Sequence, residues 1–306
     1  MSETKDLTSK VLAPATGLLL FLQAALVVTG GAVRLTGSGL GCPTWPECTP
    51  GSYTPVPHQA EPQLNVWIEF ANRLLTFALL LSALLVAINV FAIRRLARVL
   101  VLFNVSISGR KDLRVLAAGQ VLGIIGQAIL GGITVLTDLN PIPVAGHLLL
   151  SIILIAGATS LYSRRHTPAE FVVPGSLTSK ISLAHVVTSF VVIILGTIVT
   201  GSGPHAGDAQ AKRFDFDIRT VAWLHADVVI FLLGLTFALY VAAGTSARSK
   251  KEIKVFAIIA LAQGGVGYIQ YFTGIPEVLV AAHLLGATLV WIAAWRIRLS
   301  VITQNG

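Results

Sequence analysis

Long apolar stretches separated by short polar segments dominate the chain. Eight of them reach about 18 residues or more, the length that a helix needs to cross a bilayer. They cover residues 14–35, 65–93, 114–136, 143–163, 180–200, 219–243, 253–273 and 278–297. In hydrocarbon a helix satisfies every backbone amide within its own segment. The pattern therefore predicts an all-α integral membrane protein with eight transmembrane helices.

Composition and charge agree with this class and set the orientation. Of the 306 residues 54% are hydrophobic and 12% are charged, and the net charge is +8. On the eight-helix topology, 17 of the 22 Lys and Arg residues fall on the side that carries both termini. By the positive-inside rule this side is the cytoplasm, so we expect a multi-pass protein of the cell membrane with both termini cytoplasmic. The basic surplus thus reports topology and does not indicate a nucleic-acid partner.

The chain also repeats itself. The segment VVTGGAVRLTGSG at 27–39 is matched by LGTIVTGSG at 195–203, and the glycine-rich third and seventh stretches each lead into a stretch that begins with proline, small residues and His-Leu-Leu. We therefore predict two pseudo-symmetric four-helix bundles, 12–165 and 178–300, joined by the linker TPAEFVVPGSLTSK. Four helices return the chain to its starting side, so the halves have the same orientation, which is typical of a two-fold axis along the membrane normal.

Three histidines lie inside apolar stretches, near the outer face. His147 opens the fourth stretch, His283 opens the eighth, and His225 lies about two turns into the sixth. Ionisable groups in membrane helices are costly and so point to function. A single such histidine is more often structural, but His225 and His283 share one half and can face each other as an axial pair for a haem. His147 recurs at the equivalent place in the first half.

The place in the first half that corresponds to His225 falls in VWIEFANRLLTF, where it is occupied by Asn72. Glu69 and Arg73 lie on the same helical face. They form either an ion pair that caps the outer end of the helix, or a carboxylate aimed at a reacting ligand with Arg73 available for a propionate. His185 lies near the cytoplasmic end of its stretch, at a different depth, and we expect a structural role for it.

The two cysteines, Cys42 and Cys48, lie six residues apart in the first outer loop. Outside the membrane they can pair as a small disulfide. The alternatives are two free thiols or part of a metal site, although no histidine lies nearby at ligand spacing to complete one.

These residues together resemble the haem A synthase family. The resemblance covers about 14–298 and rests on GGAVRLTGSGLGCPTWPEC, on EFANR, and on the histidines that open the fourth and eighth stretches. It implies a haem b cofactor between His225 and His283 in the second half. The first half would bind the substrate haem O through His147 and oxidise its C8 methyl group to a formyl group through hydroxylated intermediates. Glu69 matches the essential carboxylate of the family, and Cys42 and Cys48 match its outer-loop disulfide.

The chain departs from the family pattern at Asn72, where many members have a second axial histidine for the substrate haem. The substrate iron is then five-coordinate, or Asn72 holds a water, or another residue moves in. The second half also lacks the cysteine pair that some members carry there. The resemblance further implies membrane lipid, haem O synthase and an unidentified electron carrier as candidate partners.

Two other functions compete with this one. A membrane haem b protein that transfers electrons without chemistry on the haem would explain His225 and His283 equally well, but it would leave Glu69 without a purpose. A transporter would be favoured by helices broken at the midplane, which the sequence does not indicate.

Overall fold

The computed structural model describes residues 2–57, 61–101, 111–165, 170–171, 177–242 and 245–304. Within them lie eight helices and one small β-ladder. The helices are α1 (Ser2–Leu35), α2 (Gln63–Val101), α3 (Lys111–Leu136), α4 (Pro141–Arg164), α5 (Leu177–Ser202), α6 (Ile218–Val241), α7 (Ala247–Phe272) and α8 (Glu277–Ile302). The ladder pairs β1 (Glu170–Phe171) with β2 (Thr303–Gln304) in antiparallel register. It attaches part of the predicted linker to the end of the chain.

The eight predicted helices are confirmed, and most of them extend past the apolar stretches. All eight are long and apolar enough to cross a membrane. The largest corrections are α1, which begins at Ser2, and α2, which continues to Val101. Charged and polar flanks continue the same backbone hydrogen bonding beyond the hydrocarbon, so an apolar run marks only the lipid-embedded part of a helix.

Several helix starts are fixed by side-chain caps, which set the depth of the residues that follow. Asn140 accepts a hydrogen bond from the backbone N–H of Ile142 at the start of α4, where Pro141 takes a position that needs no N–H donor. At α6, Asp217 accepts from the backbone N–H of Thr220 at 2.8 Å. The hydroxyl and backbone N–H of Thr220 lower the pKa of this exposed carboxyl group.

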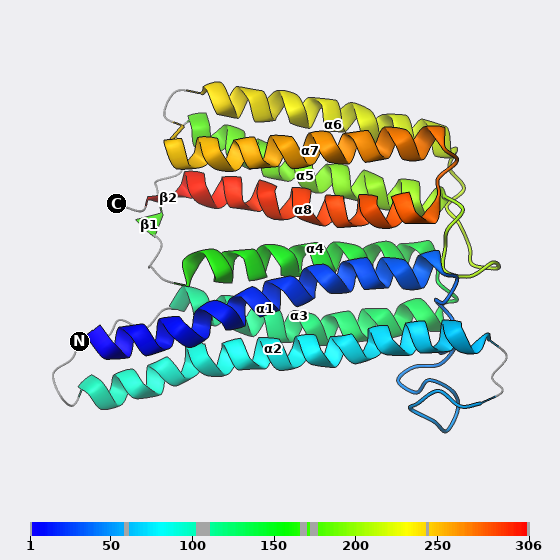
Figure 1. Cartoon of the computed structure of the whole chain (residues 1–306), viewed down its shortest axis with the longest axis horizontal. Coiled ribbons are helices and arrows are strands. Elements are labelled where there is room, and N and C mark those ends of the chain that lie inside the picture. Colours follow the sequence, from blue (N-terminus) through cyan, green and yellow to red (C-terminus); the bar gives the residue numbers. More distant parts are fainter. Residues whose placement is uncertain are drawn as a thin grey trace.

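The helices form two bundles that lie side by side (Figure 1). Helix α1 packs on α2 and α4, and α3 packs on α2 and α4; α5 to α8 show the same pattern, with α5 on α6 and α8, and α7 on α6 and α8. The bundles meet where α4 and α8 pack together, flanked by α1 on α8 and α4 on α5. These contacts exchange in pairs under a two-fold rotation. Both termini lie at one end of the molecule, and the connections α1–α2, α3–α4, α5–α6 and α7–α8 lie at the other (Figure 1).

Two tryptophans of α8 form hydrogen bonds across the interface between the bundles. The indole of Trp291 donates to the backbone carbonyl of Ile152 at 2.7 Å, and that of Trp295 donates to the Ser160 hydroxyl at 2.8 Å. Trp291 is buried in an apolar cluster that includes residues of both bundles. A buried indole N–H that finds an acceptor avoids the cost of an unmade hydrogen bond, so these contacts hold α8 against α4 at fixed register.

The outer faces of the helices are apolar. Phe21, Leu81, Leu122, Phe237 and Ile258 each expose about two thirds of their surface. Large apolar side chains exposed in this number fit a surface that faces lipid. With its eight spanning helices, the chain is a multi-pass membrane protein.

Candidate functional site

Two imidazoles face each other in the bundle of α5 to α8. His225 follows the start of α6 by two turns, and His283 lies six residues into α8. Their ring centroids are 6.5 Å apart and the ring planes are inclined by 59°. Two imidazoles bonded to one ion at about 2 Å each leave their centroids roughly 6 Å apart, so this spacing suits a pair of axial ligands.

His147, His225 and His283 each lie against a glycine of the neighbouring helix. A Cβ atom built on Gly131 would lie 3.3 Å from Cε1 of His147. The corresponding distances are 3.4 Å for Gly196 and His225, and 3.2 Å for Gly267 and His283. Contacts this short are tighter than normal packing, so larger residues at these positions would push the imidazoles out of place.

The ring nitrogens of these histidines are incompletely satisfied. The Nδ1 atoms of His147, His185, His225 and His283 are buried without a hydrogen-bond partner in the described part of the chain. A buried polar atom that makes no hydrogen bond costs about 1–3 kcal/mol. Because His185 shares this feature, the fit to a haem rests on the two facing imidazoles of His225 and His283, which are a donor set that haem iron takes.

A glutamine holds the backbone at two of the histidines. Gln127 donates from Nε2 to the carbonyl of His147 at 3.0 Å, and Gln263 donates to the carbonyl of His283 at 2.7 Å. In both halves the glutamine precedes the facing glycine by four residues and the histidine by twenty. The two glutamines were not among the residues predicted from the sequence, although their shared spacing is a signal that identifies them.

Asn72 of α2 faces α1, as His225 of α6 faces α5. A Cβ atom built on Gly30 would lie 4.0 Å from Nδ2 of Asn72, and the hydroxyl of Thr29 donates to Oδ1 at 2.8 Å. The amide is thus held by α1 at a place where an imidazole stands in the other bundle. A neutral amide carries an oxygen acceptor and an NH₂ donor and lacks the nitrogen lone pair through which imidazole binds iron.

Glu69 holds the outer loop to α2. Its Oε2 accepts from the backbone N–H of Cys42 at 2.6 Å, and its Oε1 accepts from Arg73 Nη2 at 2.6 Å. The carboxylate is 6% exposed. The structure thus contains the Glu69–Arg73 ion pair that was one of the two interpretations of this motif.

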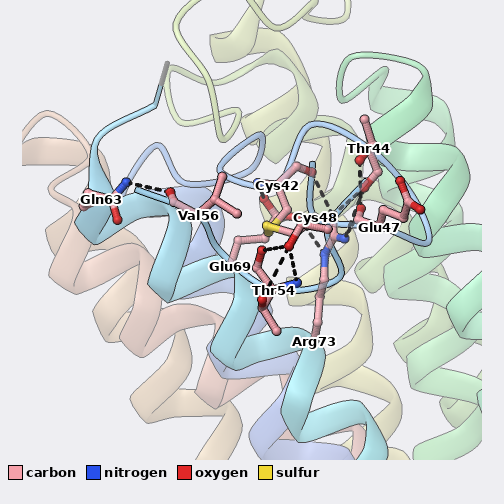
Figure 2. Close-up of a disulfide and its surroundings, with 10 residues drawn as sticks. Cys42, Thr44, Glu47, Cys48, Thr54, Val56, Gln63, Glu69 and Arg73 are labelled. Carbon is pink, nitrogen blue, oxygen red and sulfur yellow. Dashed lines mark hydrogen bonds and ion pairs between the residues drawn. A yellow bond between two sulfur atoms is a disulfide. The ribbon is translucent and has the colours of Figure 1, made fainter. Parts of the chain in front are cut away.

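Arg73 continues this attachment, as Figure 2 shows. Its guanidinium donates to the backbone carbonyls of Cys42, Thr44 and Glu47 at 2.8–3.2 Å. A partly buried guanidinium bound to three carbonyls and a carboxylate fixes the loop in one orientation. Apart from its contacts with Glu69, Arg73 makes these hydrogen bonds to the loop.

The outer loop is closed by the predicted disulfide between Cys42 and Cys48, which is present and buried. Its Trp45 packs on α3, since a Cβ atom built on Gly132 would lie 2.5 Å from the indole. Gly132 adjoins the glycine that faces His147. The loop therefore covers the outer end of the first bundle, between the helix of Glu69 and the helix next to His147.

The remaining histidines lie elsewhere. His185 is fully buried, contacts the Thr236 hydroxyl through Nε2 at 3.1 Å, and packs edge-on against Phe256. His205 contacts the carbonyl of Ile275 in the outer loops. His58 and His166, which are loop positions in the sequence, lie outside the described residues.

The chemistry available differs between the bundles. The second offers two opposed imidazoles, which suits a permanently held redox group. The first offers one imidazole, one amide and, at its outer end, a buried carboxylate. A single imidazole and a carboxylate in the same bundle suit a ligand that reacts and leaves.

Comparison with known proteins identifies the family of this chain. The pattern of the COX15-CtaA family, described as cytochrome oxidase assembly protein, matches residues 15–295. The heme A synthase of Azorhizobium caulinodans is 26% identical to this chain over 325 positions, which cover 89% of each protein. The heme A synthase of Nitrosomonas eutropha is 23% identical over 329 positions, which cover 89% of this chain and 88% of its own. Because the family match spans nearly the whole chain, this protein belongs to the COX15-CtaA family of cytochrome oxidase assembly proteins, in agreement with its sequence resemblance to the haem A synthases.

Proposed function

We propose that this protein is a haem A synthase, an oxidoreductase that converts the C8 methyl group of haem O to a formyl group through hydroxylated intermediates. The observation that carries the proposal is the pairing of two unlike sites in one chain. One bundle presents two opposed imidazoles, and the other presents one imidazole with a carboxylate close to its outer end. The family membership and the names of the two relatives support the same activity.

We assign haem b as the resident cofactor between His225 and His283. The 6.5 Å spacing of their rings and the glycines that face them support this assignment. When bound, haem b would supply one-electron transfer, because bis-imidazole iron exchanges electrons without an open ligand position. The protein contributes the depth and orientation of the imidazoles, which Asp217 sets at α6 and Gln263 at α8.

We assign the first bundle to haem O. His147 orients the substrate by binding its iron, and Asn72 faces it from the other helix pair without supplying a second strong ligand. A substrate must enter and leave, and one axial bond holds it less firmly than two. The disulfide-bonded loop closes the outer end, which excludes water and presents Glu69.

Glu69 would act on the carbon being oxidised. Conversion of a methyl to a formyl group is a four-electron oxidation that adds one oxygen atom, so the electrons must pass to an electron-accepting partner and the protons must leave through a base. A carboxylate held by Cys42 and Arg73 can accept a proton from the hydroxylated carbon, or stabilise positive charge that develops there. Arg73 remains a candidate for a substrate propionate, but such a contact requires it to release loop carbonyls that it now binds.

The termini share one end of the molecule with the basic flanks of the helices, and we propose that this end is cytoplasmic in the cell membrane. The outer loop and its disulfide then lie on the oxidising side, where disulfides persist.

Chromatography of extracted haems tests the activity. The protein is expressed in a host that makes haem O but no haem A, and the haems of its membranes are compared with those of the host alone. A new formyl-haem peak is expected. If haem b copurifies with the protein while no haem A or hydroxylated haem forms, the chain is an electron-transfer protein instead.

Glu69→Gln tests the assigned carboxylate in the same host. The amide keeps the shape of the side chain and an oxygen acceptor for Cys42, but it accepts no proton. Product should fall at least a hundredfold, in the range that loss of general-base catalysis gives. The absorption spectrum of the resident haem should be unchanged. Normal product formation would remove Glu69 from the chemistry.

A further inference from the structure

Arg34 crosses from one bundle to the other at their outer seam. It lies in the last turn of α1, yet its Nη2 donates to the backbone carbonyl of Thr200 in α5 at 2.7 Å, and its Nε donates to the carbonyl of His205. Beside it the backbone N–H of Gly39 donates to the carbonyl of Gly207 at 2.9 Å. Figure 1 shows the α5–α6 connection at this seam.

Arg213 binds the same connection from within the second bundle. Its two terminal nitrogens donate to the carbonyls of Pro204 and Ala211 at 2.8 and 2.7 Å. Its neighbour Phe214 is fixed to the end of α5 through Gly201, whose carbonyl accepts from the Phe214 N–H at 2.9 Å. The two arginines thus bind the adjacent carbonyls of residues 204 and 205, close enough for their charges to repel each other.

This pair of cations lacks an anion. Arg34 and Arg213 are both partly buried, and neither forms an ion pair with a carboxylate in the part of the chain that the structure describes. Asp208 and Asp217 accept backbone N–H groups of their own segments instead. A guanidinium has five N–H donors, and the hydrogen bonds above use two on each. Two partly buried like charges with spare donors are what an anionic ligand would neutralise.

The pair lies directly outward of the two facing imidazoles. Thr200 follows Gly196, the glycine against His225, by one helical turn. On the other wall Gly31 packs against Leu284, the residue after His283, since a Cβ atom there would come within 2.2 Å of Cδ2. Arg34 is one turn beyond Gly31. The Thr200 carbonyl that Arg34 binds is therefore about one helical turn outward of the contact between Gly196 and His225.

We propose that Arg34 and Arg213 bind the carboxylates of the haem held between His225 and His283, so that a residue of the first bundle completes the cofactor site of the second. This inference rests on the proposed function, which places haem b there. The propionate carboxylates are the charged part of a haem, and charge is excluded from hydrocarbon. They must therefore point to the outer end, where Arg34 and Arg213 lie.

A ligand with its carboxylates blocked tests the proposal. The full-length chain is produced in a haem-limited host as the His147→Ala variant, so that the signal comes from the other site. It is then titrated with haem b and with haem b dimethyl ester, and the Kd for each is read from the Soret band. Haem b should bind at least tenfold more tightly than the ester, as expected when charge-assisted hydrogen bonds are lost.

The arginine variants decide where this preference arises. Arg34→Gln and Arg213→Gln should each reduce it several-fold, and together they should abolish it. Lys212→Gln removes the same charge from an exposed position of the same connection. This variant should leave the preference for haem b over its dimethyl ester unchanged.

A merely structural role of the arginines predicts a different result. Their loss would then weaken both ligands equally and leave the preference unchanged, which overturns the proposal. The proposal is also overturned if the chain that keeps both arginines binds haem b and the ester equally well. The assignment of haem b would still stand in that case if His225 is necessary for binding. If the chain binds neither ligand, the assignment of haem b fails with it.

Discussion

The side-chain amide of Gln263 donates to the backbone carbonyl of His283 across the α7–α8 contact, at 2.7 Å. That carbonyl belongs to a helix and has a second lone pair free for such a donor. The hydrogen bond therefore ties the turn that carries the imidazole to the neighbouring helix. Gln127 does the same for His147. The two halves therefore position their equivalent histidines by the same kind of hydrogen bond.

Replacing Gln263 by Leu should loosen the resident haem. One hydrogen bond of this kind contributes about 1 kcal/mol to stability, so the protein should still fold. The fraction of haem b retained on purification should fall, and the Soret band should broaden as His283 samples more orientations. Gln127→Leu is the matched control: it should lower product formation while leaving the resident haem spectrum unchanged.

Gly286→Ala provides a second route to the same effect. A Cβ atom at this position would lie 1.8 Å from Oε1 of Gln263, so the glutamine must move although its amide is retained. Haem retention should fall as in Gln263→Leu. Full retention in both variants would show that the hydrogen bond does not position His283.

Replacing Gly267 by Val should displace an axial ligand. The added Cβ alone would lie 3.2 Å from Cε1 of His283, and the two methyl groups beyond it need space that the imidazole occupies. Purified protein should lose most of its haem b. Gly265→Val, on the same helix in open space, tests whether valine in α7 is itself harmful. Equal haem loss in both variants would contradict a specific contact with His283.

Replacing Arg73 by Lys should uncouple the outer loop from α2. An ammonium group keeps the charge, but it cannot reproduce the planar array of donors that binds Glu69 and the three loop carbonyls. Limited proteolysis within residues 36–62 should accelerate, and product formation should fall at least tenfold. Arg219→Lys, at an exposed position on the same side, should change neither. A variant with a protected loop and normal activity would show that the attachment is dispensable.

The pattern of the sequence was sufficient for the helices and for the opposition of His225 and His283. Apolar length fixes a membrane helix, and the depth of a side chain follows from its position after the helix start. The spacing of four residues places Glu69 and Arg73 on the same face of the helix, so their ion pair could also be anticipated.

Contacts made by loops could not be anticipated in this way. Trp45 meets Gly132, and Arg34 of α1 meets the His205 carbonyl in the α5–α6 connection, only because the chain folds back over the helix ends. No periodicity relates such residues, since loops place side chains through backbone hydrogen bonds and irregular dihedral angles. The attachment of Asn72 to Thr29 likewise depends on how α1 and α2 are rotated against each other.

Replacing Asn72 by His should convert the substrate site into a retaining one. A glycine lies beside Asn72 as one lies beside His225, with distances from the added Cβ of 4.0 Å to Asn72 Nδ2 and 3.4 Å to His225 Cε1, so we expect an imidazole to be accommodated. It would give the substrate iron a second strong ligand opposite His147. Purified protein should then carry about two haems instead of one, because the reacting haem leaves more slowly.

Turnover and spectrum distinguish this outcome from misfolding. Product formation by Asn72→His should fall while bound substrate or product rises, and the added haem should show a low-spin, six-coordinate spectrum. Asn72→Leu, which fills the space without a ligand, should raise neither the haem content nor the low-spin signal. If the histidine variant gains no haem although His225 and His283 still hold theirs, Asn72 does not face the substrate iron. The single imidazole of the first bundle would then be its complete ligand set.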